Sequence, residues 1–200
     1  MNDDLRDELD RMRRRDDATR IRLMESGELF DGYSETMERV HLENASRLEE
    51  ILDEHGWPTA GLVGDEGEEA AWLIVQHAIS RPDLQRRCLG LLIEAAAEGE
   101  APAWQVAYLA DRIRVNEGQP QIYGTQLDWD RDGELVPQPI EAPAEVDKRR
   151  AEVGLLPLAE AVELARRHAR SEGHRPPADP EASRERREEW ARRVGWIDSP

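Results

Sequence analysis

The run from Ala70 to Ile79, AAWLIVQHAI, is strongly apolar in a chain of which only 38% is hydrophobic and 36% is charged. Apolar residues lie on almost every side of a helix drawn through this run, and such a helix is normally buried. Asp65 and Glu68 precede it with the spacing of a capping box, within the glycine-rich connection GLVGDEGEE. The run therefore predicts a central helix that starts near Asp65 and around which the other elements pack.

Helical periodicity continues through most of the remaining chain. Capping and stop residues predict further helices at about 3–26, 34–55, 82–98, 102–116, 144–153, 157–172 and 181–194. The sequence Asp130–Gly133 lies between two extended runs, 119–129 and 134–138, and predicts a β-hairpin. The expected fold is mainly α with a small β-hairpin (α+β), with a single-domain helical bundle-like core.

Three segments are expected along the chain. Residues 1–33 form an N-terminal helical arm, because the apolar stripe of its helix is narrow and can bury little surface; the stripe consists of Leu5, Leu9, Met12 and Leu23. Residues 34–172 form the helical core domain, with the hairpin at about 119–138. Residues 173–200 form a proline-rich linker and a charged helix, and we expect them to be dispensable for the core fold.

The charge and the cysteine content exclude several classes of function. Forty-four acidic against 27 basic side chains give a net charge of −17, which disfavours binding to nucleic acids and to anionic membranes. The single Cys88 excludes an intrachain disulfide and a cysteine-based metal cluster. No signal-like segment and no apolar run of about 18 residues occurs. An acidic, soluble, cytoplasmic protein is expected.

Several polar residues fall where the helical pattern points inward. His41 and Asn44 lie on the apolar face of the helix at 34–55, and Gln76 and His77 lie in the middle of the central helix. A buried polar group without a hydrogen-bond partner costs roughly 1–3 kcal/mol. These four side chains therefore either satisfy one another and the backbone or belong to a site.

The stretch from Asp111 to Gln126, DRIRVNEGQPQIYGTQ, contains the densest group of such residues. Asp111 falls on the apolar face of its helix, where a carboxylate needs an ion-pair or hydrogen-bond partner, and a histidine or an arginine is the natural choice. The residues after this helix place amides and hydroxyls on either side of Gly124. These residues are Gln121, Tyr123, Thr125 and Gln126.

The chain resembles an uncharacterised bacterial and eukaryotic family, the DUF6624 domain. The similar segments are Gly56-Trp57-Pro58, Gln76-His77-Ala78, Tyr108-Leu109 with Asp111-Arg112, Gln121 to Gln126, and Val146-Asp147 through Arg149-Arg150 to Gly154-Leu155. The resemblance covers about residues 34–165. The family often has an aspartate directly after Gln-His-Ala, where this chain has Ile79. The resemblance implies a shared fold and a shared polar core, without implying a reaction.

An acid–base site is the functional hypothesis that these residues favour. His77 oriented by Asp111, with Tyr123 as a second proton carrier, would supply proton transfer or hydrolysis by activated water. Arg112 would hold an anionic group of a small molecule or a peptide. The remaining candidate ligand-binding residues are Gln76, Gln121, Thr125, Gln126, His41 and Asn44.

Two alternatives remain open at this point. The same polar residues could form a structural network that fixes the hairpin against the helices, or the chain could be a binding module that meets a protein through Trp190 and Trp196. The sequence has no HExxH, CxxC or HxH spacing, no glycine-rich phosphate loop and no GxSxG motif. Neither a metal nor a cofactor is therefore expected.

Overall fold

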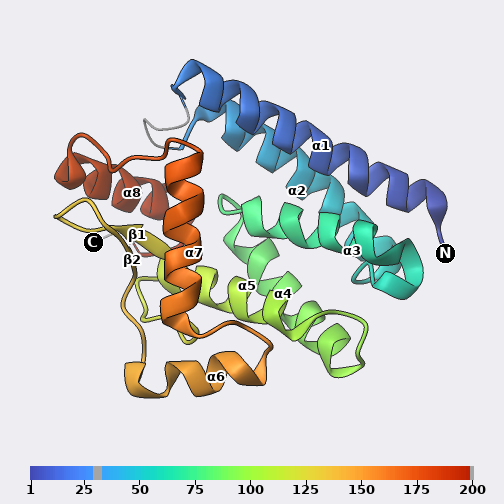
Figure 1. Cartoon of the computed structure of the whole chain (residues 1–200). Helices are drawn as coiled ribbons and strands as arrows, with labels where there is room; N and C mark the ends of the chain where they lie inside the picture. Colours follow the sequence, from blue (N-terminus) through green and yellow to red (C-terminus); the bar gives the residue numbers. More distant parts are fainter. Residues whose placement is uncertain (29–32, 199–200) are drawn as a thin grey trace. The chain divides into compact units, whose positions relative to one another are not determined.

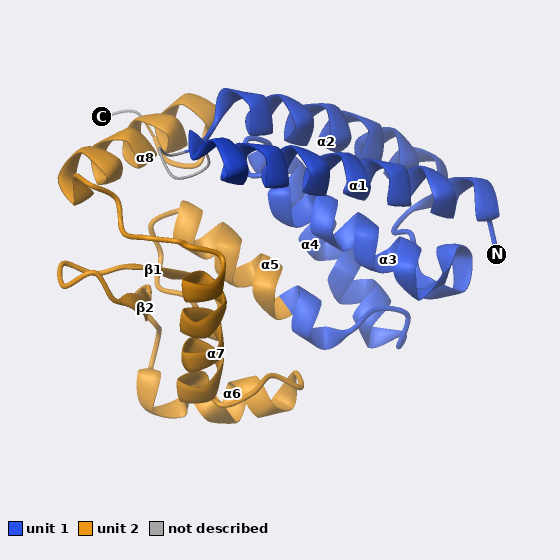
Figure 2. Cartoon of the chain, turned by 45° about the horizontal axis from the view of Figure 1, so that its top comes forward, with its two compact units in different colours: residues 1–106 blue, residues 107–200 orange. Residues whose placement is uncertain are grey.

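The computed structural model describes residues 1–28 and 33–198. Within this part of the chain, 69% of residues are helical and eight α-helices accompany one small antiparallel sheet, which confirms the expected mainly-α fold with a β-hairpin. The elements follow one another along the chain as Figure 1 shows. They form two compact units, residues 1–106 and 107–200 (Figure 2).

Unit 1 begins with α1, Asp3–Ser26, which packs along α3, Ala60–His77, and also contacts α2, Glu35–His55 (Figure 1). The Asn2 side chain caps α1 by accepting a hydrogen bond from the Leu5 amide, and Gly27 ends the helix with a φ of +82°. The buried face of the helix is continuous, because Asp16 and Thr19, which lie between Met12 and Leu23, are also buried. The helix that looked narrowly apolar therefore buries a carboxylate in its middle.

Helix α2 follows its sequence pattern closely. Its N-cap is Ser34, whose hydroxyl accepts a hydrogen bond from the Thr36 amide, and Gly56 lies at its C-terminal end. All seven residues of the expected inward stripe are buried, and these are Met37, Val40, His41, Asn44, Leu48, Ile51 and Leu52. The alternation of apolar and charged residues was sufficient to orient this helix.

Helix α3 starts earlier than expected. It begins at Ala60 and is kinked at Gly64, whose φ of +76° and ψ of +166° are not helical, so the connection predicted at 61–69 is wrong. Glu68 is not a capping residue, because its side chain is buried and accepts a hydrogen bond of 2.9 Å from Gln105. Gly64 permits the kink because glycine adopts positive φ without a steric penalty.

The rest of unit 1 closes around α3. Helix α4, Pro82–Ala97, starts with a proline in its first turn and buries Leu84, Cys88 and Leu92. Helix α5, Ala103–Asn116, begins in unit 1 and continues into unit 2. The C-terminal turn of α3 is held by Gln85 of α4, whose amide donates to the Val75 carbonyl at 2.6 Å.

Unit 2 contains the hairpin, with strands β1, Leu127–Trp129, and β2, Leu135–Pro137. The strands are antiparallel, with Asp128 opposite Val136. They are shorter than the extended runs predicted at 119–129 and 134–138. Residues 121–126 leave the extended path because their backbone amides turn toward the Asp111 carboxylate. The Asp-Gly turn was predicted correctly, whereas the strand length depended on a tertiary contact.

The remaining helices of unit 2 are α6, Val146–Glu152, α7, Leu158–Ser171, and α8, Pro180–Val194, with a 3-10 turn at Pro143–Glu145 before α6. Helix α7 contacts β2 and α6. Trp190 of α8 is half-buried and Trp196 is only 4% exposed. Trp196 therefore does not offer the exposed apolar surface that a docking role for this segment requires.

The segment boundaries near residues 34 and 172 stay predictions, because compact units in a structure do not establish which segments fold alone. No helix in the described ranges 1–28 and 33–198 is both long enough and apolar enough to span a bilayer.

Glu68 provides a test of the packing in unit 1. Burial raises the pKa of its carboxyl, and the hydrogen bond from Gln105 opposes this increase only in part. Because the pKa is higher in the folded than in the unfolded chain, the stabilisation is complete below the unfolded value and is lost as the pH rises through the folded value.

We therefore expect Glu68→Gln to increase the free energy of unfolding above the folded pKa of Glu68, by on the order of 1 kcal/mol. Urea unfolding of the variant and the wild type across the acidic and neutral range measures this difference. Glu66→Gln is the matched control, because Glu66 is exposed, and it should show no such pH dependence. A wild-type protein that gains stability relative to Glu68→Gln as the pH rises would contradict the expectation.

Candidate functional site

The Asp16 carboxylate of α1 is the centre of a polar cluster inside unit 1. Its side chain is 2% exposed, and one oxygen, Oδ2, lies 2.9 Å from His77 Nδ1 and 3.2 Å from His41 Nε2. Burial alone would raise the pKa of Asp16, but the two imidazoles outweigh it and hold that pKa well below its usual range. The two imidazoles thus favour the ionised form of Asp16.

The two imidazoles differ in their surroundings. The His41 side chain is 8% exposed, and its Nδ1 lies 2.8 Å from the Tyr33 hydroxyl, so both ring nitrogens of His41 face polar groups. The His77 side chain is 28% exposed, and the centres of the two imidazole rings are 5.0 Å apart. The cluster is thus closed on the side of His41 and open to solvent at His77.

Two atoms of this cluster are buried without a hydrogen bond to any described residue. They are Asp16 Oδ1 and His41 Nε2, although the latter lies within ion-pair distance of Oδ2. Both the Nε2 and the Oε1 atom of Gln76, the neighbour of His77, are likewise buried without a partner within the described ranges. Native structures leave few such atoms, and an unfilled binding site is one reason for them.

Asp16, His41 and His77 together have the composition of a metal site. Each offers one ligand atom, and the three atoms lie within 4.8 Å of one another. Ligand atoms around a tetrahedral zinc ion are separated by roughly 3.4 Å, given metal–nitrogen and metal–oxygen distances near 2.1 Å. The two Asp16–imidazole distances are close to this separation.

Asn44 and Gln85 have structural roles in unit 1. Asn44 Nδ2 donates to the Met12 carbonyl at 3.2 Å and links α2 to α1. Gln85, which was not among the predicted site residues, holds the end of α3 through the Val75 carbonyl.

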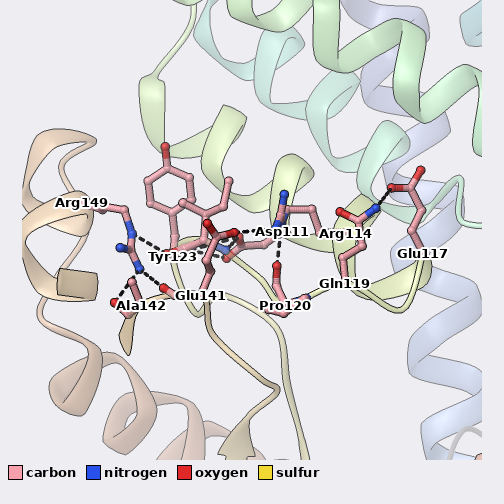
Figure 3. A network of polar contacts seen from close by, with 10 residues as sticks. Asp111, Arg114, Glu117, Gln119, Pro120, Tyr123, Glu141, Ala142 and Arg149 are labelled. Carbon is pink, nitrogen blue, oxygen red and sulfur yellow. Dashed lines mark hydrogen bonds and ion pairs between the residues drawn. The ribbon is translucent and has the colours of Figure 1, made fainter. Parts of the chain in front are cut away.

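Unit 2 contains a buried carboxylate of its own, Asp111, with a different environment. It is fully buried and accepts hydrogen bonds from the amides of Ile122, Tyr123 and Thr125, at 2.6 to 3.1 Å, and from the Thr125 hydroxyl. Figure 3 shows Asp111 and Tyr123 of this network from close by. The partners of Asp111 are therefore backbone amides and a hydroxyl, and no histidine or arginine is needed to compensate its charge.

The loop around Asp111 is also held from its outer side. Arg149 donates to the carbonyls of Ile122 and Glu141, and Arg150 donates to the carbonyl of Tyr123. Figure 3 shows Arg149 beside Glu141. Burial lowers the pKa of Arg150, whose hydrogen bonds go to carbonyl oxygens. Positively charged side chains thus fix the backbone that the carboxylate binds.

Gln121 completes this loop. Its Nε2 donates to the carbonyls of Gln126 and Gln138, and its Oε1 accepts from the Gln126 amide. Gly124 lies between them with a φ of +70°, and a Cβ atom there would lie 2.8 Å from side-chain atoms of Ile140 and Leu158. The amides that the sequence offered as ligand-binding groups are engaged by the chain itself.

The other two candidates of this stretch, Tyr123 and Arg112, are less engaged. Burial, followed by the nearby charge of Asp111, raises the pKa of the half-buried Tyr123. Burial lowers the pKa of Arg112 to about 10, and its Nε has no partner among the described residues.

The structure thus brings His41 and His77 together in unit 1 and gathers Asp111, Gln121, Thr125 and Gln126 in unit 2. The pairing of His77 with Asp111, like the roles assigned to the unit 2 residues, stays a prediction, and each of the two has partners within its own unit. Asp16 was missed because it lies in the charged run RMRRRDD. A signal was present, since Asp16 and Thr19 continue the spacing of Leu9, Met12 and Leu23.

Comparison with known proteins gives a family. A model of a family of unknown function, DUF6624, matches residues 3–169. The chain belongs to the DUF6624 family. The match begins in α1 and so includes Asp16 as well as both histidines of the cluster. No curated protein and no solved structure matches this DUF6624 chain.

For the Asp111 loop we expect Asp111→Asn to lower the free energy of unfolding by roughly 3 kcal/mol, because an amide group would replace an acceptor that faces backbone donors. Denaturant unfolding measures the change. Asp132→Asn, at an exposed position in the hairpin loop, is the control and should stay within about 0.5 kcal/mol of the wild type. Equal effects of the two substitutions would show that the loop does not depend on the carboxylate.

Tyr123→Phe should leave the free energy of unfolding within about 0.5 kcal/mol of the wild type, because the half-buried ring remains and only the hydroxyl is lost. The same unfolding experiment applies. A loss of more than about 1 kcal/mol would mean that the hydroxyl has a buried partner.

Proposed function

We propose that this DUF6624 protein binds a divalent transition-metal ion through Asp16, His41 and His77, and that it is an enzyme that uses the ion to activate water against a small molecule or a peptide. The observation that supports the proposal is the convergence of two imidazoles and one carboxylate, whose ligand atoms lie within 4.8 Å of one another. Asp16 Oδ1 and His41 Nε2 are moreover buried without hydrogen bonds to described residues.

The ligand set is suited to zinc or iron. Two histidines and one carboxylate hold catalytic zinc, and the same set in a facial arrangement holds non-haem iron. The ionised Asp16 would supply the negative charge that compensates a divalent cation. A metal ion would also bind His41 Nε2, which is buried without a hydrogen bond to any described residue.

The surroundings of the ligands also support this assignment. Ligand histidines usually have their second ring nitrogen held by a hydrogen bond, which fixes the orientation of the ring. The Tyr33 hydroxyl, 2.8 Å from His41 Nδ1, would have this positioning role. The partial exposure of His77 leaves a side of the cluster from which water or a substrate could reach the ion.

A catalytic metal ion keeps one coordination position for water and lowers the pKa of that water toward neutrality. The three protein ligands would orient the ion, and Asp16 would fix both imidazoles around it. In this proposal Asp16 has the role beside His77 that the acid–base hypothesis gave to Asp111. Tyr123 and Arg112 have no chemical role in it.

Metal binding can be tested without a known substrate. We expect the metal-free protein to bind one Co²⁺ ion with the visible absorption bands of a low-symmetry site that contains imidazole, and Zn²⁺ to displace it. Asp16→Asn and His77→Gln should abolish the bands or weaken binding by more than tenfold. Tyr33→Phe should weaken binding by about 10- to 100-fold, because it acts through the orientation of His41.

His55→Gln is the matched control, because His55 lies at the end of α2 and its ion-pair partner in the described part of the chain is the exposed Glu54. It should bind Co²⁺ as the wild type does. Circular dichroism of each metal-free variant separates loss of a ligand from loss of the fold. Absence of Co²⁺ and Zn²⁺ binding, or an equal loss in His55→Gln, would overturn the metal site.

The proposed enzymatic activity is tested by a separate measurement. Hydrolysis of chromogenic esters, phosphoesters and peptide amides is measured with metal-free, zinc-loaded and iron-loaded protein. We expect turnover of at least one class only in a loaded form and its loss in His77→Gln. Metal binding without turnover of any class would contradict the enzyme and leave the metal site in place.

A further inference from the structure

Helices α1 and α2 enclose a second feature of unit 1, a groove that contains arginines. It is a cavity of about 330 Å³. Its lining residues are Arg15, Ala18, Thr19 and Arg22 from α1, and Thr36, Arg39 and Val40 from α2. None of the residues that line it is acidic. In a chain with 44 acidic and 27 basic side chains, this is a local reversal of charge.

The helix geometry places these groups on facing surfaces. Arg15, Thr19 and Arg22 are spaced four and three residues apart and therefore lie on one face of α1. Thr36 and Arg39 are three residues apart on α2 and lie on one face in the same way. The charge of the groove thus comes from two adjacent helices.

Two of the three guanidinium groups are available. Arg15 pairs with the exposed Glu43 of α2. Neither Arg22 nor Arg39 has an ion-pair or hydrogen-bond partner within the described ranges, and both side chains are exposed. Each guanidinium carries five N–H donors that can bind two oxygens of one anionic group.

The lining also offers a neutral donor and an apolar floor. The Thr19 hydroxyl is not that donor, because it already donates to the Arg15 carbonyl at 2.8 Å. The Thr36 hydroxyl has no partner among the described residues. Thr19 and Val40 are buried at the base of the groove, one turn after Asp16 and directly before His41.

We propose that this groove binds the oxyanion group, phosphate or carboxylate, of a small molecule, with Arg22 and Arg39 as the principal ligands. The cavity volume is at the lower end of the range for small-molecule sites, roughly 300–1,000 Å³, so it suits a small ligand or one group of a larger one. The high negative charge of the chain disfavours a polyanion such as nucleic acid, whereas a small anion meets only the local field of the arginines. Anion binding here does not depend on the proposed metal ion.

The test uses the full-length, metal-free protein with a chelator present, so that phosphate cannot bind through a metal. Inorganic phosphate is titrated into ¹⁵N-labelled protein, and acetate is titrated into a second sample. We expect saturable shifts of the Thr19, Thr36 and Val40 amide resonances with at least one of the two anions, which identifies the preferred class. Affinity should fall as sodium chloride is added, because these exposed charges are screened.

Arg22→Ala combined with Arg39→Ala should weaken binding of that anion by at least tenfold. Arg86→Ala combined with Arg87→Ala is the charge-matched control, since it removes two exposed positive charges from α4, outside the lining of the groove. The control should bind as the wild type does, and circular dichroism checks the fold of both variants.

Three results would overturn the proposal. These are the absence of saturable shifts with both anions, equal weakening in the two double variants, and shifts confined to resonances outside the groove. Loss of Co²⁺ binding in Asp16→Asn with unchanged anion binding supports both sites as separate features. Anion binding without any metal binding would leave the groove in place and remove only the proposed metal site.

Discussion

A carboxylate that is removed from water must be compensated by hydrogen bonds or by positive charge, and unit 1 is organised around one such group. Asp16 lies in the buried stripe of α1, and its only close partners among the described side chains come from α2 and α3. The three helices therefore have to meet at this point with His41 and His77 facing inward. Apolar packing alone would tolerate many alternative registers of these helices, whereas a buried charge tolerates few.

Asp111 and Asp16, two of the buried carboxylates, show how the number of hydrogen bonds to a carboxylate distinguishes a structural role from a functional one. Asp111 receives backbone amides and a hydroxyl at both oxygens, so it fixes the loop and retains little capacity for a ligand. Asp16 uses one oxygen for two imidazoles, and its other oxygen is buried without a hydrogen bond to any residue in 1–28 or 33–198. An aspartate thus fixes a loop in unit 2, whereas an aspartate in unit 1 belongs to a polar cluster that still has a buried oxygen without a described partner.

Charge is distributed unevenly over this acidic protein. In unit 2, Arg149 and Arg150 donate to main-chain carbonyls and hold the backbone around Asp111. In unit 1, Arg22 and Arg39 face a groove and have no partner in the described part of the chain. In a chain with a net charge of −17, such a groove is a local reversal of charge.

The sequence by itself determined the positions of most helices, the inward face of α2 and the turn of the hairpin. These features depend on local periodicity, caps and turn residues, which act over a few positions. It also indicated that His41, Asn44, Gln76, His77 and Asp111 are inside, and all are buried except His77, which is partly exposed. Family membership was visible in the same way, through short motifs such as the YGTQ run.

Only the tertiary structure decided which of these polar residues are partners. Asp16 and His77 are 61 residues apart, and Asp16 lies in a charged run that resembles a solvated surface. The hairpin strands are shorter than predicted because backbone amides of residues 121–126 donate hydrogen bonds to the Asp111 carboxylate. Glu68 is buried where it accepts a hydrogen bond from Gln105. The local sequence pattern specifies that a polar side chain is buried. Its partner is decided by the packing of helices that are far apart in sequence, because the hydrogen bond that stabilises the buried group forms only when those helices meet.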